Sequence, residues 1–68
     1  MANSHPIHTV AVINSNEDII ELLGLLLADA GFHTVGEHLA SFKKGRVDFT
    51  AFCQQHQPEV IILDIAPV

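Results

Sequence analysis

Residues 58–64 read PEVIILD, and this stretch decides the fold of the chain. Helices end before a residue such as Pro58, and the four residues after Glu59 are all branched and apolar. A run of this length without polar alternation is typical of a strand that is buried on both faces, as in a parallel sheet. We therefore expect a strand over residues 59–65, with Asp64 near its carboxyl end.

A second run of this kind lies near the beginning of the chain. A strand is predicted over residues 7–13 from the apolar run Val10 to Ile13. It ends at Asn14-Ser15-Asn16, which are residue types that form turns and cap helices. The polar residues 1–6 before it are expected to form a disordered terminus.

Between the first strand and the middle of the chain, apolar residues recur at helical spacing and predict a helix over residues 16–30. The apolar positions are Ile19, Leu23, Leu26, Leu27 and Ala30, widened by Ile20 and Leu22. Ser15 or Asn16 is expected to cap the beginning of this helix, and Gly31 its end in a left-handed conformation. Leu25 falls on the opposite side, where either a single exposed leucine or a partner contact accounts for it.

A short second strand, a loop and a second helix complete the alternation of strands and helices. Residues 32–37 predict a second strand, and residues 41–46 are expected to form a loop because they contain two lysines and Gly45. A second helix is predicted over residues 48–56, and Pro58 stops it. Its apolar side is formed by Phe49, Phe52, Cys53 and His56. The order strand, helix, strand, helix, strand predicts an α/β fold with parallel strands, right-handed crossovers and helices on both faces.

The composition favours one small folded unit. The chain has 68 residues, of which 49% are apolar and 16% charged, so disorder is excluded. Eight acidic and three basic residues give a net charge of −5, which argues against direct binding to nucleic acid or to an anionic membrane. The apolar runs are too short to span a bilayer, no secretory signal is visible, and the single Cys53 cannot form an internal disulfide. We therefore expect a cytoplasmic protein, with Cys53 in its core.

Ligands of open parallel sheets bind beyond the carboxyl ends of the strands, so the positions of interest are residues 14–17, 39–41 and 64–67. Neither a GxGxxG motif nor a GxxxxGK[ST] motif is present, which argues against a dinucleotide fold and a P-loop. The five histidines do not have metal-ligand spacing, so no transition-metal site is expected. From position alone, Asp64 is a turn residue, a helix cap or a carboxylate held in a site.

Three segments resemble the first half of a receiver domain, the phosphoacceptor domain of two-component response regulators. They are residues 10–17 (VAVINSNE), residues 27–32 (LADAGF) and residues 57–65 (QPEVIILDI). The family pattern is an apolar strand that ends in an acidic pair, a helix that closes in glycine and an apolar residue, and a strand that carries the phosphoacceptor. The resemblance spans almost the whole chain. It implies an incomplete flavodoxin-like βαβαβ unit over residues 1–68, with a parallel sheet of strand order 2-1-3.

By this resemblance, Asp64 takes the place of the aspartate that accepts a phosphoryl group from a histidine kinase or a phosphotransfer protein. The chain would then be a phosphoacceptor and not an enzyme with catalytic residues of its own. In the family, Mg²⁺ is held by the acidic pair, by the acceptor and by a backbone carbonyl two residues past it. The corresponding positions here are Asn14, Ser15, Asp64 and Ala66.

The sequence departs from the family pattern at the acidic pair. Asn14 and Ser15 replace both carboxylates, so we expect the Mg²⁺ site to be weak or absent and phosphorylation of Asp64 to be slow. Glu17 is either a further ligand or a first-turn acid stabilised by the helix dipole. Pro67 follows Asp64 by three residues where the family has four, which alters the loop that carries the backbone ligand.

The family's later strands, with their switch Ser/Thr and their Lys, do not occur in this sequence. The alternative function is therefore a degenerate receiver that acts as a protein-interaction or dimerisation module without phosphotransfer. A small-molecule binder that uses the strand-end crevice is a third possibility. Because the outer edge of Val60 to Leu63 would be bare and apolar, we also expect a homo-oligomer joined through this strand.

Overall fold

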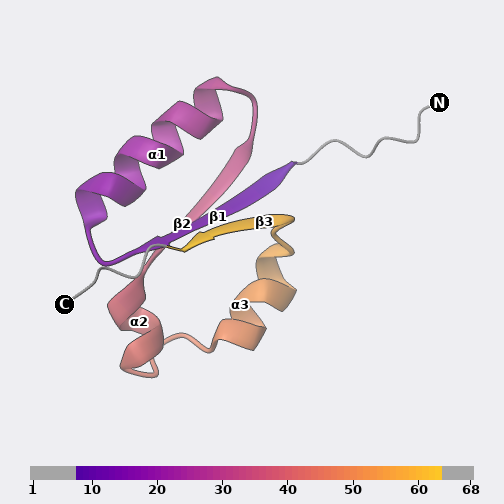
Figure 1. Ribbon diagram of the computed structural model, residues 1–68. Helices are drawn as coiled ribbons and strands as arrows, with labels where there is room; N and C mark the ends of the chain where they lie inside the picture. Colours follow the sequence, from indigo (N-terminus) through magenta and orange to yellow (C-terminus); the bar gives the residue numbers. More distant parts are fainter. Residues whose placement is uncertain (1–7, 64–68) are drawn as a thin grey trace.

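The computed structural model describes residues 8–63, which form a three-stranded parallel sheet with helices on both faces (Figure 1). In chain order the elements are β1 (Thr9–Asn14), α1 (Glu17–Asp29), β2 (His33–His38), α2 (Leu39–Lys43), α3 (Phe49–His56) and β3 (Val60–Leu63). β1 lies in the middle of the sheet, and the strand order is β2-β1-β3. The expected α/β βαβαβ fold with strand order 2-1-3 is therefore confirmed.

β1 forms the core of the molecule because it has a strand on each side and helices above and below. Its residues Val10 to Ile13 are at most 4% exposed. Ala11 and Ile13 pack with Phe52 of α3 on one face. The alternate residues Val10 and Val12 therefore point to the other face, which α1 covers (Figure 1). A strand buried on both faces accounts for the continuous apolar run in the sequence.

Both ends of α1 are capped by side-chain or backbone hydrogen bonds. Asn16 is the N-cap, and its Oδ1 accepts from the backbone N–H groups of Asp18 at 2.9 Å and Ile19 at 3.4 Å. At the other end Gly31 adopts φ = 100°, and the N–H of Phe32 donates to the carbonyl of Leu27. This arrangement is a Schellman motif, which only a residue free of Cβ strain accommodates easily. Of the two predicted N-caps, Asn16 is the one the chain uses.

Only some of the apolar residues of α1 are partly buried. Ile20, Leu23 and Leu27 are half-buried, whereas Leu22 and Leu26 are more than half exposed. The apolar stripe predicted for α1 is therefore only partly buried by the described residues, and Leu22 and Leu26 are exposed on it. The reason is that α1 packs against β1 and β2, so the described residues do not cover its side towards β3. Leu25 is exposed, as predicted.

The close packing of α1 on β2 depends on a glycine. A Cβ built on Gly36 would come within 2.5 Å of Cγ2 of Ile20. This distance is far shorter than an ordinary carbon–carbon contact of about 3.5–4.0 Å. The absence of a side chain at this strand position thus allows the helix to approach the sheet.

The prediction of a loop over residues 41–46 is wrong in part, because α2 extends to Lys43. His38 caps this short helix, with its Nδ1 accepting from the N–H of Ala40 at 3.0 Å. Phe42 of α2 packs edge-on against Phe52 of α3, with ring centroids 5.4 Å apart. Packing against the aromatic core stabilises a helical turn that the local sequence does not predict.

The other boundaries lie within two residues of the predicted ones where the structure describes them. The expected terminus at residues 1–6 and the last two residues of the predicted strand 59–65 lie outside the described residues. Within residues 8–63, no helix is long and apolar enough to span a membrane.

Candidate functional site

The carboxyl ends of the three parallel strands meet at one edge of the sheet, and two of the predicted site residues lie there. Asn14 is the last residue of β1 and is paired with His38, the last residue of β2. On the other side of β1, Ile13 is paired with Leu63, the last residue of β3. Leu63 is followed in the sequence directly by Asp64. Asp64 and Ala66 lie outside the described residues, so the roles expected for them stay predictions.

Asn14 is a buried polar residue, with only 4% of its surface exposed. Its Oδ1 accepts a hydrogen bond from the backbone N–H of Asn16 at 2.8 Å. This bond spans two residues and forms an Asx-turn, which directs the chain from β1 into α1. Ser15, between the two asparagines, is exposed. The neutral amide of Asn14 therefore has a structural role in this turn.

These two residues do not fit a Mg²⁺ site. Magnesium in proteins is bound through carboxylates and phosphates, with water completing the octahedron. Asn14 and Ser15 supply neutral oxygens, and the Asn14 oxygen already accepts a backbone hydrogen bond. Among residues 8–63, no three His, Cys, Asp or Glu side chains come together as a metal-binding group. Asn14 and Ser15 thus lack the negative charge that a hard dication requires.

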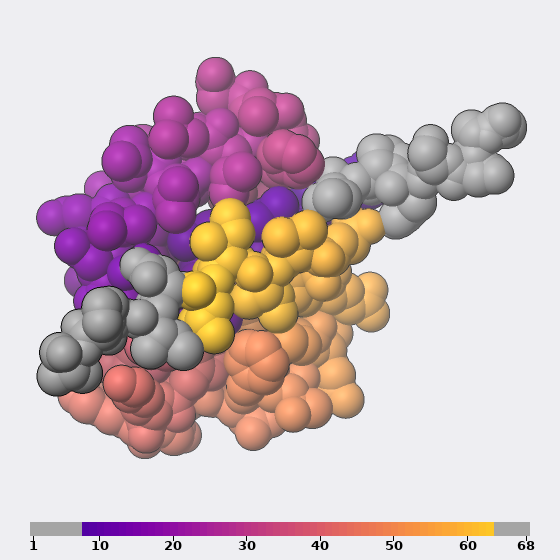
Figure 2. Space-filling view, in the orientation of Figure 1, coloured from indigo at the N-terminus to yellow at the C-terminus, as the bar shows by residue number. Residues whose placement is uncertain are grey.

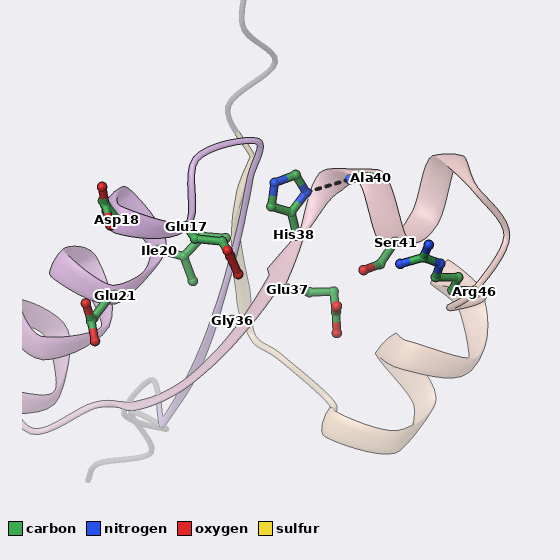
Figure 3. Close-up of a pocket in the computed structure, with 10 residues that line it drawn as sticks. All are labelled: Glu17, Asp18, Ile20, Glu21, Gly36, Glu37, His38, Ala40, Ser41 and Arg46. Atoms are coloured by element: carbon green, nitrogen blue, oxygen red, sulfur yellow. Dashed lines mark hydrogen bonds between the residues drawn. The ribbon is translucent and has the colours of Figure 1, made fainter.

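A groove of about 760 Å³ lies beside this edge, between the first turns of α1 and the end of β2 (Figure 3). It is lined by Glu17, Asp18, Ile20, Glu21, Gly36, Glu37, His38, Ala40, Ser41 and Arg46. Figure 3 shows Glu17 and Ile20 on the α1 side and Ser41 and Arg46 on the α2 side. Neither Asn14 nor Ser15 is among the described residues that line the groove. Parts of the segments 14–17 and 39–41, predicted to border a ligand crevice, do line it.

The charges of the groove disfavour an anionic ligand. Four carboxylates line it, from Glu17, Asp18, Glu21 and Glu37, against the single guanidinium of Arg46. Repulsion between carboxylates and a phosphate would oppose binding of a phosphorylated molecule there. Glu17 was a predicted site residue, but the groove itself was not predicted, because Arg46 follows α2, a helix that the sequence did not predict.

Cys53 and His56 are part of the packing of α3. Cys53 is half-buried against the core cluster of Ala11, Ile13 and Phe52. The ring of His56 lies 4.8 Å from that of Phe52, centroid to centroid. The interpretation of Cys53 as a core residue is therefore confirmed.

Comparisons of the chain with models of protein families, with curated proteins and with solved structures found no match. The fold is thus established by the strand order and register alone.

Proposed function

We propose that the chain is a receiver-like module of two-component signalling, in which Asp64 accepts a phosphoryl group from a histidine kinase or a phosphotransfer protein. The observation that carries this proposal is the register of β1 and β3. Ile13 is paired with Leu63, so the residues that follow them in the sequence are Asn14 and Asp64. The proposal requires the Asp64 carboxylate to lie beside Asn14 at the carboxyl edge of the sheet, where open parallel sheets bind ligands.

The proposed chemistry is a nucleophilic displacement at phosphorus. An oxygen of the Asp64 carboxylate attacks the phosphoryl group of a phosphohistidine, the P–N bond breaks, and an acyl phosphate forms on Asp64. The imidazole of the donor leaves with the electron pair of that bond and takes up a proton. The transferring group is highly anionic, so positive charge nearby accelerates the reaction. Because Asn14 and Ser15 supply no carboxylates for a magnesium ion, the rate is expected to be low.

The test is labelling of the 68-residue chain by acetyl phosphate in millimolar Mg²⁺, followed by intact-mass measurement. We expect the mass increase of one phosphoryl group to develop over minutes to hours, and to be absent in Asp64→Asn. Labelling of the wild type and Asp64→Asn to the same extent would show that Asp64 is not the acceptor. Labelling within a second would show that the missing carboxylates do not limit the reaction.

A second candidate function is a protein-interaction module without phosphotransfer. It is favoured by the burial of Asn14 and by the hydrogen bond of its amide to the backbone of Asn16. This neutral residue stabilises the turn but contributes no charge to phosphoryl chemistry. Complete absence of labelling in the wild type, with the fold intact by circular dichroism, would favour this second function. For the first function, a histidine kinase or phosphotransfer partner implies a cytoplasmic setting.

A further inference from the structure

The groove of about 760 Å³ lies along the outer side of β2. In the described part of the chain, β2 and β3 are the outer strands of the sheet, and Figure 2 shows β3 at the surface between α1 and α3. On the β2 side, the groove is lined by Gly36, Glu37 and His38 of the strand. One wall is formed by the first turns of α1, and the other contains Ser41 and Arg46 (Figure 3).

The backbone groups of β2 that point to the groove follow from one hydrogen bond. The N–H of His33 donates to the carbonyl of His8, in the direction of β1, at 2.6 Å. Because the direction of backbone groups alternates along a strand, Glu37 also turns its N–H and C=O groups towards β1. Thr34 and Gly36 therefore direct theirs away from β1, to the side on which the groove lies.

Gly36 makes this part of the strand accessible. It is exposed, and because glycine has no side chain, its exposed surface belongs to its backbone. A Cβ at this position would come within 2.5 Å of Cγ2 of Ile20, so the packing of α1 requires a glycine here. The backbone donor and acceptor of Gly36 are thus available to an extended segment that enters the groove.

The two walls of the groove differ in charge. The α1 wall contributes Glu17, Asp18 and Glu21 and no basic residue. On the other wall Figure 3 shows Glu37 on the same side as Arg46, so one acid is matched by one base. The helix dipole accounts for Glu17 and Asp18 in the first turn of α1, but not for Glu21 one turn later. The α1 wall therefore attracts positive charge, whereas the α2 wall is close to neutral.

We propose that the groove binds an extended peptide segment of a partner protein, which adds to β2 as a strand and carries lysine or arginine at every second position. In strand addition, backbone hydrogen bonds supply affinity and alternate side chains supply specificity. The segment pairs with the outward groups of Thr34 and Gly36. Its side chains alternate between the two faces of the sheet, so one set lies against the acids of α1 and the other against the α2 wall. The basic residues form the first set, and small polar residues form the second.

The charge of the groove disfavours other occupants. A second copy of this chain would bring a β2 strand with Glu37 and without lysine or arginine, together with a net charge of −5. The phosphates of a nucleic acid or of a lipid headgroup would meet the same carboxylates. A basic segment has the opposite charge to the α1 wall. Its binding requires no phosphorylation of Asp64, so the test below is separate from the labelling test of the proposed function.

Titration of the 68-residue chain with two synthetic peptides tests the proposal. Both are acetylated and amidated at their ends. One is Lys-Thr-Lys-Thr-Lys-Thr, and the other is Lys-Lys-Lys-Thr-Thr-Thr, which has the same charge but cannot direct all its lysines to one face. We expect the alternating peptide to bind at least ~10-fold more tightly in an NMR chemical-shift titration. Equal affinity of the two peptides, or no binding of either at ~1 mM, would overturn the proposal.

Two acids of α1 provide a matched pair of variants. Glu21→Gln removes a carboxylate from the groove and should weaken binding of the alternating peptide at least ~3-fold. Asp29→Asn, at the end of the same helix and outside the groove, should change the affinity by less than ~1.5-fold. Circular dichroism verifies that both variants fold. Equal weakening by the two substitutions would show that the net charge of the chain determines the affinity, and would refute a site in the groove.

Hydrogen exchange distinguishes strand addition from binding through side chains alone. With the alternating peptide at saturation, exchange of the Gly36 amide should slow at least ~10-fold more than that of Val35, whose N–H already points towards β1. Methylation of the peptide's own amides gives a second readout. Only alternate groups of an added strand face β2, so methylating either the lysine or the threonine amides, but not both, should abolish binding. No change at Gly36, or the same effect of both methylations, would contradict strand addition.

Discussion

Asn14 and Asn16 are joined by a hydrogen bond of 2.8 Å, from the backbone N–H of Asn16 to the side-chain Oδ1 of Asn14. Asn16 in turn caps α1 through its own side chain. Two asparagines, one on each side of Ser15, thus direct the chain out of the buried strand β1 and into the first helix. Asn14, which the resemblance to receiver domains places at a carboxylate position, thus stabilises a turn.

This relationship predicts that negative charge at residues 14 and 15 restores magnesium binding. Asn14→Asp keeps an oxygen that accepts from the N–H of Asn16, so the turn should persist, and Ser15→Asp adds a second carboxylate. We expect the double variant to be labelled at Asp64 by acetyl phosphate at least ~10-fold faster than the wild type, and only when Mg²⁺ is present. The same variant with Asp64→Asn is the control and should not be labelled. A rate equal to that of the wild type would show that a cause other than the missing carboxylates limits the reaction.

The N-cap of α1 can be assigned by two alanine substitutions. Asn16→Ala removes the acceptor of the Asp18 and Ile19 N–H groups and should lower the free energy of unfolding by about 1 kcal/mol. Ser15 is exposed, so Ser15→Ala should change this energy by less than about 0.5 kcal/mol. Urea denaturation followed by circular dichroism measures both. A larger loss for Ser15→Ala than for Asn16→Ala would contradict the observed cap.

The contact between α1 and β2 predicts opposite effects at two glycines. Gly36→Ala forces a methyl group against Cγ2 of Ile20, a side chain that is stiff at χ1, and should destabilise the fold by about 1–3 kcal/mol. Gly24→Ala in α1 meets only Oγ1 of Thr34, at 3.7 Å, and should stabilise the helix by about 0.5–1 kcal/mol.

A double-mutant cycle identifies the cause of the Gly36 effect. In an Ile20→Ala background, Gly36→Ala should cost at least about 1 kcal/mol less than in the wild type, because the clashing methyl is gone. Additive effects in urea denaturation would show that Gly36 is required for a reason other than its distance from Ile20.

The two sides of α1 should respond differently to a polar substitution. Leu23 is half-buried, so Leu23→Gln should lower the free energy of unfolding by about 1–2 kcal/mol. Leu26 is 59% exposed, so Leu26→Gln should stay within about 0.5 kcal/mol of the wild type. Both variants have the same change of chemistry on the same helix, so thermal or urea melts compare them directly. An equal loss at Leu26 would mean that another surface covers this side of α1 in solution.

Features that depend on a few consecutive residues were predicted correctly from the sequence. The run Val10 to Ile13 implied burial on both faces, and β1 is the central strand. Gly31 implied a left-handed end for α1, and it has a positive φ. In both cases the requirement lies within a few consecutive residues, so no distant contact is needed to deduce it.

Features that depend on packing between distant residues were not predicted from the sequence. α2 is five residues long and is capped by His38, a residue type outside the usual N-caps, so its helical turn depends on Phe42 packing against Phe52. The exposure of Leu26 depends on which strands lie beneath α1. The groove beside β2 depends in turn on α2, which brings Arg46 towards Glu17 and Glu37.

The sequence by itself determined the alternation of strands and helices and the residues that follow each strand, since hydrophobic periodicity and turn-forming residues are local properties. Only the tertiary structure decided that Ile13 is paired with Leu63, that Asn14 is paired with His38, and that Asn14 is buried and bonded to Asn16. These features depend on which strands become neighbours and in which register. That choice is made by side chains far apart in the chain as they pack into one core.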